Sequence, residues 1–164
     1  MNEEITDLLC RLVSTPSLSG REDKTAALLA AYLNGKPDIL AERMGNNVIA
    51  KKRSYAPGRP TVLLCSHHDT VAPAAGYTRD PFLPVLEKDP EGNTRLYGLG
   101  SNDAGGAVVS MVQTFCDPED LPFNLLLILA AGEENSAPEG IASVLPRFPG
   151  ISCALVGEPT GLQA

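Results

Sequence analysis

The sequence has no long apolar run and no excess of basic residues, and each absence removes a class of protein. A membrane-spanning helix needs roughly 20 consecutive apolar residues, and no stretch of the chain approaches that length. The 13 lysines and arginines are outnumbered by 20 acidic residues, and the net charge of −7 argues against nucleic acid or an anionic membrane as a partner. Because the N-terminus also lacks the basic flank of a signal peptide, we expect a cytoplasmic protein.

Cysteine and histidine are scarce, and their spacing excludes several kinds of site. The cysteines occur singly without a C-x-x-C spacing, so neither a zinc knuckle nor a disulfide framework is indicated, and we expect reduced, mostly buried thiols. They are Cys10, Cys65, Cys116 and Cys153. The two histidines, His67 and His68, are adjacent, and no G-x-S-x-G pattern is present, which disfavours a Ser-His-Asp hydrolase. A dinucleotide-binding loop is disfavoured because Asp103 stands where its third glycine belongs.

The hydrophobic pattern predicts one domain in which helices and strands alternate, since 164 residues suffice for one well-buried core. Helices are expected over residues 5–14, 22–33, 107–115 and 139–145. Strands are expected over residues 47–52, 61–66, 85–88, 94–97, 123–131 and 153–156. Three of these strands, 61–66, 123–131 and 153–156, are apolar on both faces, which is typical of buried central strands. The alternation predicts an α/β fold with a mostly parallel sheet.

Residues of the types that bind metals follow each of the three apolar strands. His67 and Asp69 come after the first, the pair Glu133 and Glu134 after the second, and Glu158 after the third. A further acidic residue, Asp103, ends the glycine-rich turn at residues 98–103. Because reactive residues of open α/β sheets collect at the carboxyl ends of the strands, we expect these side chains to form one metal site.

The position of Asp69 distinguishes the two histidines, only one of which is expected to bind metal. Side chains two apart share a face of an extended chain, so Asp69 can accept a hydrogen bond from the ring nitrogen of His67 that holds no metal. His67 is therefore the expected ligand. His68 points to the opposite face and is a poor candidate.

The carboxylates suit complementary roles. Asp103 can bridge two metals roughly 3.5 to 4 Å apart, although a helix cap is the simpler alternative for an aspartate before Ala104. Of the adjacent Glu133 and Glu134, one can hold metal. The other can stay free to take a proton from metal-bound water, whose pKa zinc lowers to roughly 7.

Together these segments resemble the dizinc metallopeptidase and deacylase family that includes acetylornithine deacetylase, succinyl-diaminopimelate desuccinylase, aminoacylase and glutamate carboxypeptidase. The family's small residue-His-x-Asp-x-Val motif is matched at residues 66–71 and its glycine-rich motif at 98–103. Its paired glutamates are matched at 133–134 and its last carboxylate motif at 157–160. The resemblance covers essentially the whole chain and implies a three-layer α/β/α catalytic domain that binds two Zn²⁺ ions, with Co²⁺ as a possible substitute.

The resemblance also assigns roles to individual residues. The implied metal ligands are His67, Asp103, Glu134 and Glu158. Asp69 is implied to orient His67, and Glu133 to be the general base that deprotonates the attacking water and then protonates the leaving amine.

The implied reaction is hydrolysis of the amide bond of a small N-acyl amino acid. The motifs look closest to the branch that acts on N-acetylornithine or N-acyl-citrulline in arginine biosynthesis. Leu99 and the pair Ala104-Gly105 depart from many relatives, which leaves the substrate open. An exopeptidase of the same family and a catalytically silent binding module are the alternatives.

One departure concerns the length of the chain. The family supplies a second histidine ligand from its C-terminal portion, after an inserted lid and dimerisation domain, and the sequence ends at Ala164 before either. We expect residues 1–164 to be the N-terminal part of the catalytic domain of a longer, homodimeric enzyme. The metal held by Asp103 and Glu134 is then one protein ligand short, and the isolated chain is expected to be inactive.

Overall fold

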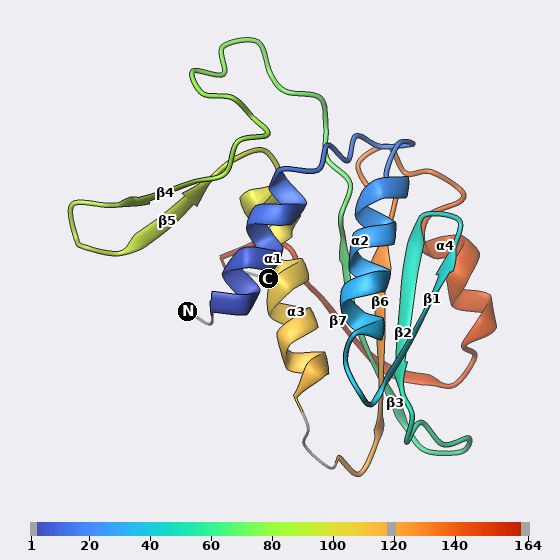
Figure 1. The fold of residues 1–164 in the computed structure, drawn as a ribbon. Helices are drawn as coiled ribbons and strands as arrows, with labels where there is room; N and C mark the ends of the chain where they lie inside the picture. Colours follow the sequence, from blue (N-terminus) through green and yellow to red (C-terminus); the bar gives the residue numbers. More distant parts are fainter. Residues whose placement is uncertain (1–2, 118–120, 162–164) are drawn as a thin grey trace.

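The computed structural model describes residues 3–117 and 121–161, drawn in colour in Figure 1. Its helices are α1 (Glu3–Val13), α2 (Asp23–Asn34), α3 (Ala107–Cys116) and α4 (Ile141–Val144), with short helical turns η1 (Ser101–Gly106) and η2 (Leu145–Arg147). Its strands are β1 (Ile39–Met44), β2 (Asn47–Lys52), β3 (Thr61–His67), β4 (Val85–Lys88), β5 (Thr94–Tyr97), β6 (Asn124–Ala130) and β7 (Ile151–Val156). Each element predicted from the sequence is present with slightly shifted ends, and β1 is an additional strand.

Five strands form the central sheet in the order β1-β2-β6-β3-β7. The centre is parallel as predicted, because β3 pairs in parallel with both β6 and β7. β2 runs antiparallel to β6 and to β1, to which it is joined by the two-residue turn Gly45-Asn46. The strands β4 and β5 form a separate hairpin that projects from the body of the molecule (Figure 1). The carboxyl ends of β3, β6 and β7 therefore lie side by side along one side of the sheet, where the parallel strands end.

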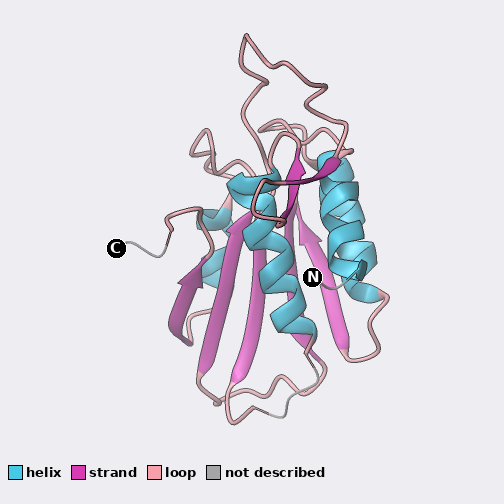
Figure 2. Cartoon of the chain, turned by 90° about the vertical axis from the view of Figure 1, so that its left-hand side faces the viewer, coloured by secondary structure: helices cyan, strands magenta, loops and turns pink. Residues whose placement is uncertain are grey.

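Apolar side chains alternate along the strands and build a core on each face of the sheet. On one face Leu64 and Leu127 pack in the larger apolar cluster with the side chains of α1, α2 and α3. On the other face Leu63 and Ile128 pack in a smaller cluster with Val144 of α4. The layers can be followed in Figure 2, and they confirm the three-layer α/β/α arrangement. Within the described ranges, no helix combines the length and apolar composition needed to span a bilayer.

The prediction that residues 153–156 form a buried strand is wrong. β7 is the edge strand of the sheet, and Leu155 and Val156 are 55% and 65% exposed. Cys153 of β7 is exposed as well, and of the four thiols only that of Cys65 is fully buried, which corrects the expectation of mostly buried cysteines. The physical reason is the sheet order, because an edge strand has a neighbour on one side only and its burial depends on what else packs against it.

Candidate metal centre

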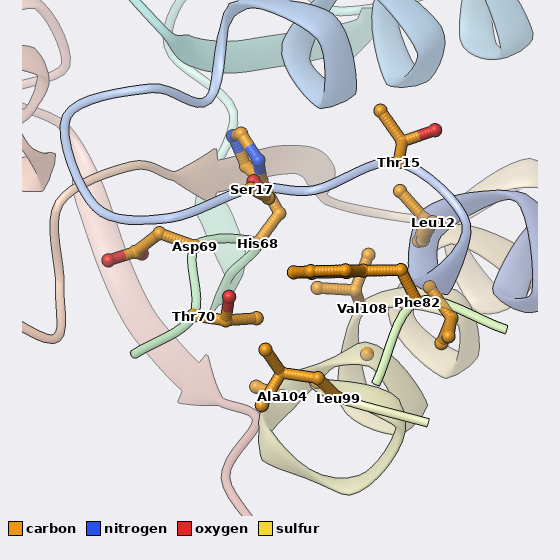
Figure 3. A pocket seen from close by; sticks show the side chains of 13 residues that line it. Leu12, Thr15, Ser17, His68, Asp69, Thr70, Phe82, Leu99, Ala104 and Val108 are labelled. Carbon is orange, nitrogen blue, oxygen red and sulfur yellow. The ribbon is translucent and has the colours of Figure 1, made fainter. Parts of the chain in front are cut away.

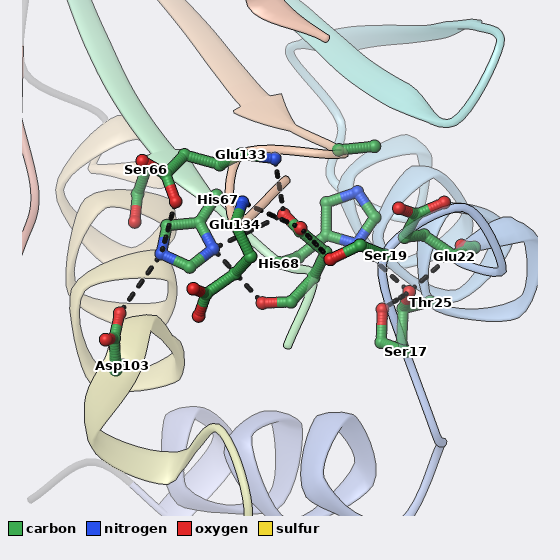
Figure 4. Close-up of polar contacts among 12 residues, drawn as sticks. Ser17, Ser19, Glu22, Thr25, Ser66, His67, His68, Asp103, Glu133 and Glu134 are labelled. Carbon is green, nitrogen blue, oxygen red and sulfur yellow. Dashed lines mark hydrogen bonds and ion pairs between the residues drawn. The ribbon is translucent and has the colours of Figure 1, made fainter. Parts of the chain in front are cut away.

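The residues expected at the site meet where the central parallel strands end (Figure 4). His67 is the last residue of β3, and Glu133 and Glu134 lie in the turn that follows β6. Glu158 lies two residues beyond the end of β7, and Asp103 belongs to η1, directly before α3. Residues far apart in the sequence are thus brought together by the parallel pairing of three strands.

Three of these side chains form a compact set of metal-type donors. The Nε2 atom of His67 lies 3.1 Å from Oδ1 of Asp103 and 3.7 Å from Oε2 of Glu158. One donor atom from each of the three residues lies within 4.8 Å of the other two. One imidazole nitrogen and two carboxylate oxygens are ligands that Zn²⁺ accepts at about 2.0 to 2.2 Å. The three donor atoms could therefore bind one divalent metal ion if the side chains moved slightly closer together.

Asp69 is fully buried and fixes the surroundings of His67. Its Oδ1 atom accepts the main-chain N–H of Glu133 at 3.1 Å and lies 3.4 Å from Nδ1 of His67. Its Oδ2 atom accepts the hydroxyl of Ser19 at 2.8 Å and the main-chain N–H of Glu134 at 3.2 Å. Nδ1 of His67 also lies 3.1 Å from the carbonyl oxygen of Asp69, so both of its neighbours are acceptors. Nδ1 therefore carries the hydrogen, and in the neutral ring the Nε2 lone pair faces Asp103.

The pKa shifts show how these contacts change the charges of the site. Burial alone raises the pKa of Asp69, but hydrogen bonds from His67, Ser19 and two main-chain N–H groups lower it to about 2. Burial alone lowers the pKa of His67, but the carboxylates of Asp69 and Glu158 outweigh it and raise that pKa to about 9. At neutral pH in the metal-free chain, the ionised Asp69 therefore faces a protonated, positively charged imidazole ring.

Two further acids of the site, Glu134 and Glu158, have raised pKa values. Burial, followed by repulsion from Asp103, raises the pKa of Glu134, and the pKa of Glu158 is raised mainly by burial. Both shifts mean that the ionised form is disfavoured where it stands. A cation bound beside these carboxylates would favour their ionised forms.

The two adjacent glutamates are placed differently from the compact donor set. The carboxylate of Glu133 lies beside it, with Oε2 at 3.9 Å from Nε2 of His67, and its side chain is 52% exposed. Glu134 is anchored through its main chain to Asp69, but its carboxylate is not one of the three grouped donors. Its role as a ligand to a second metal therefore stays a prediction.

His68 faces away from the donor set, as the strand alternation predicts. Its Nε2 atom lies 3.0 Å from the carbonyl oxygen of Asn46 and its Nδ1 atom 3.0 Å from the hydroxyl of Thr25. Because a carbonyl only accepts, Nε2 carries the hydrogen and Nδ1 accepts from Thr25. Burial lowers the pKa of His68, which keeps the ring neutral. Both ring nitrogens are used within the fold, so His68 is not available as a ligand.

The glycine-rich turn that carries Asp103 has steric reasons for its glycines. Gly100 has a φ of +75°, and a Cβ atom there would lie 2.6 Å from Cγ2 of Thr70. The N–H of Gly105 donates to the carbonyl of Gly100 at 2.8 Å, and a Cβ at Gly105 would lie 2.4 Å from that carbonyl oxygen. The Asp103–Ala104 peptide bond within the turn is cis. The close approach of the two glycines holds the turn in which Asp103 points at His67.

Two cavities lie near these residues. The smaller one, lined by His68, Asp69 and Thr70 among others, has a volume of about 20 Å³ (Figure 3). Such a cavity admits a single water molecule and no substrate. The larger is an open groove of about 790 Å³ beside the β4-β5 hairpin, and its lining includes Ser101 and Asn102, the two residues before Asp103. Its volume is in the range of small-molecule sites.

Two polar residues that the sequence patterns did not reveal also organise this edge of the sheet. Ser19 bonds Asp69 from the loop between α1 and α2. Asn47, which is buried, accepts the N–H of Ala131 at 3.1 Å and donates to the carbonyl of Glu139 at 2.7 Å. Neither residue stands in a recognisable motif, and these three partners, Asp69, Ala131 and Glu139, are 50 to 92 residues away in the chain.

Comparison with curated proteins finds relatives that are named as a desuccinylase and a deacetylase. The chain is 30% identical over 168 residues to a succinyl-diaminopimelate desuccinylase of Xylella fastidiosa, which matches 96% of the chain and 43% of that protein. It is 32% identical over 168 residues to an acetylornithine deacetylase of Edwardsiella ictaluri, which matches 93% of the chain and 42% of that protein. The chain thus spans less than half the length of these relatives.

Comparison with solved structures gives the same fold. A metallo-carboxypeptidase of Sulfolobus solfataricus superposes with a TM-score of 0.74 at 22% identity, over 96% of this chain and 37% of the other. The family described as peptidase family M20/M25/M40 matches residues 63–164, which include all six residues expected at the site. With the match extending over most of its length, the chain belongs to the peptidase family M20/M25/M40.

Proposed function

We propose that this chain is the metal-binding part of a metal-dependent hydrolase that cleaves the amide bond of an N-acyl amino acid. The observation that carries the proposal is the grouping of His67, Asp103 and Glu158, whose donor atoms lie within 4.8 Å of one another. The carboxylate of Glu133 lies beside this group, 3.9 Å from Nε2 of His67. A ligand set with a free carboxylate next to it is the arrangement that metal-assisted hydrolysis requires.

The donor types favour Zn²⁺, with Co²⁺ as a substitute. His67, Asp103 and Glu158 would hold one ion, and Asp103 with Glu134 would contribute to a second. A divalent ion held by these residues would supply Lewis-acid chemistry, polarising a carbonyl and acidifying water.

The residues of the chain supply the remaining steps. Glu133 takes the proton of the attacking water and delivers it to the nitrogen of the leaving amine. Its half-exposed side chain is accessible to substrate, while its main chain is fixed by the hydrogen bond to Asp69. Asp69 also keeps the hydrogen of His67 on Nδ1, which leaves Nε2 free to bind metal.

The substrate class follows from what the two sequence relatives have in common. Their names specify a succinyl derivative and an acetyl derivative of a diamino acid, so we propose an N-acyl amino acid and leave the acyl group open. N-acetylornithine and N-acetylcitrulline, expected from the motifs, remain candidates together with N-succinyl-diaminopimelate.

We further propose that residues 1–164 are the N-terminal part of the catalytic domain of a longer, homodimeric enzyme. Two observations support a longer chain: the chain matches 43% of the length of the desuccinylase relative, and apolar side chains of β7 such as Leu155 are exposed. Additional chain that packs on β7 would bury them, and it would supply the missing ligand of the second metal.

The test is an assay of the full-length protein on N-acetylornithine, N-acetylcitrulline, N-succinyl-diaminopimelate and a dipeptide. We expect one of the N-acyl amino acids to have the highest kcat/KM. The Glu133→Gln variant should retain its bound metal and lose about 10²- to 10⁴-fold in kcat, the range typical of a lost general base. A preference for the dipeptide would replace deacylation with exopeptidase activity, and full activity of the variant would remove the proposed mechanism.

A further inference from the structure

The loop between α1 and α2 pairs with the chain that follows β3. The N–H of Thr70 donates to the carbonyl of Ser17 at 2.9 Å, and the N–H of Ser19 donates to the carbonyl of Thr70 at 3.2 Å. Leu18 and Thr70 form a parallel bridge between the two segments. This short pairing fixes the main chain of residues 17–19 against the residue that follows Asp69.

The pairing places the hydroxyl of Ser19 on the buried carboxylate. Oγ of Ser19 donates to Oδ2 of Asp69 at 2.8 Å, and Figure 4 shows Ser19 on the side of His67 remote from Asp103. A hydrogen bond to an ionised acceptor is stronger than one between neutral groups. Among the described residues, Ser19 is the only side chain that donates a hydrogen bond to Oδ2 of Asp69, since the other donor is the main-chain N–H of Glu134.

The carboxylate of Asp69 connects the ligand to the base. Oδ1 is shared by Nδ1 of His67 and the N–H of Glu133, while Oδ2 is shared by Ser19 and the N–H of Glu134. Rotation of this carboxylate about its Cβ–Cγ bond would disturb all of these contacts at once. The bond from Ser19 opposes that rotation, because it holds Oδ2 from a main chain that is itself paired to Thr70.

We infer that Ser19 is a positioning residue that acts through Asp69 on His67 and on the turn of Glu133 and Glu134 together. The inference rests on the proposed function for its consequence in catalysis, but its structural part concerns only hydrogen bonds within the chain. Ser19 contacts neither a ligand nor the base, and its effect is to keep the carboxylate of Asp69 in the one orientation that serves both.

Ser17 offers a matched control in the same loop. Its hydroxyl is buried and lies 2.7 Å from the hydroxyl of Thr25, so Ser17→Ala also removes one hydrogen bond from this loop. Because Ser17 does not bond the carboxylate of Asp69, its loss tests general loosening of the loop. Ser19→Thr keeps a hydroxyl at position 19 and tests rescue.

The first measurement is amide hydrogen exchange of the metal-free chain by NMR, which needs neither metal nor activity. Ser19→Ala should speed the exchange of the Glu133 and Glu134 amides at least about 5-fold relative to amides of the β3 core, because their acceptor is released. Ser19→Thr should restore slow exchange, and Ser17→Ala should leave both amides as in the wild type. Unchanged exchange in Ser19→Ala, or equal acceleration by Ser17→Ala, would overturn the inference.

The second measurement is Co²⁺ binding followed by calorimetry and by the visible absorption of the bound ion. Loss of a group that orients a ligand typically costs about 10- to 100-fold in metal affinity, so we expect Ser19→Ala to raise the Kd at least about 10-fold and to shift the absorption band. A wild-type chain that binds no Co²⁺ would contradict the proposed metal site, while the exchange data would still decide the role of Ser19. Binding by Ser19→Ala that equals the wild type would show that Asp69 needs no support from Ser19.

Discussion

At the scale of single residues, His67 is where the charges of the site balance. On its Nδ1 side it faces the buried Asp69, and on its Nε2 side it faces the carboxylates of Asp103 and Glu158. In the metal-free chain a proton on the ring serves as the counter-charge, which is why the pKa of His67 rises to about 9. A metal bound at Nε2 would take the place of that proton, so His67 would couple metal binding to pH.

The raised pKa predicts how the stability of the metal-free chain depends on pH. A group with a raised folded-state pKa contributes its full stabilisation below its unfolded value of 6.5, and the contribution is lost as the pH rises through about 9. The melting temperature in the presence of a chelator should therefore fall from pH 6.5 to pH 9. His67→Gln should flatten this part of the profile, and a wild-type profile that is already flat would show that the imidazolium is not stabilised as described.

Much of the site could be predicted from single residues and their neighbours. His67, Asp103 and Glu158 follow from a local rule, since each stands at a strand end or in a glycine-rich turn, and the structure brings them together. Ser19 and Asn47 could not be found in this way. Their bonds cross 50 and 84 residues to Asp69 and Ala131, and a serine or asparagine in a turn has many local uses that give the same pattern.

At the scale of elements, the turn η1 determines the position of one expected ligand, Asp103. Its backbone leaves helical geometry at Asp103 and Ala104, and the turn closes through the hydrogen bond between Gly105 and Gly100. The function of the element is therefore to present one carboxylate at the start of α3. A change that opens the turn should affect stability and metal binding together.

Gly105→Ala is the sharpest test of this element. The added methyl would lie 2.4 Å from the carbonyl oxygen of Gly100, a main-chain atom that cannot move without opening the turn. We expect a loss of about 1 to 3 kcal/mol in the free energy of unfolding, as for other overpacked sites, and weaker metal binding. Urea denaturation and calorimetry measure the two effects. Gly150→Ala is the matched control, since nothing lies within 4 Å of a Cβ there, and equal behaviour of the two variants would contradict the role given to the turn.

β7 shows why some properties of an element escape sequence patterns. Its residues 151–156 are as apolar as those of a central strand, and this composition predicts burial. Its exposure depends on the order of the strands in the sheet and on what packs beyond β3, which are not local properties. β3 and β6 were predicted correctly because a run that is apolar on both faces needs cover on both, and the helices of the chain provide it.

At the scale of the whole molecule, the same strand pairing builds the centre of the sheet and gathers the residues of the site. The parallel pairing of β3 with β6 and β7 brings the carboxyl ends of three strands to one edge, and α3 begins beside that edge from η1. The α/β class and the parallel centre could be predicted from alternating patterns. The antiparallel attachment of β2 to β6 could not, because it depends on a choice of partner between strands that lie far apart in the sequence.

The central claim is that this edge binds a divalent metal, and zinc titration of the metal-free chain by calorimetry tests it most directly. We expect saturable binding that raises the melting temperature. Asp103→Asn and Glu158→Gln should each weaken binding at least about 10-fold, because each removes a charged ligand. Glu91→Gln, in the exposed turn of the β4-β5 hairpin, should bind as the wild type does. Absence of saturable binding, or equal affinity of all the variants, would contradict the account.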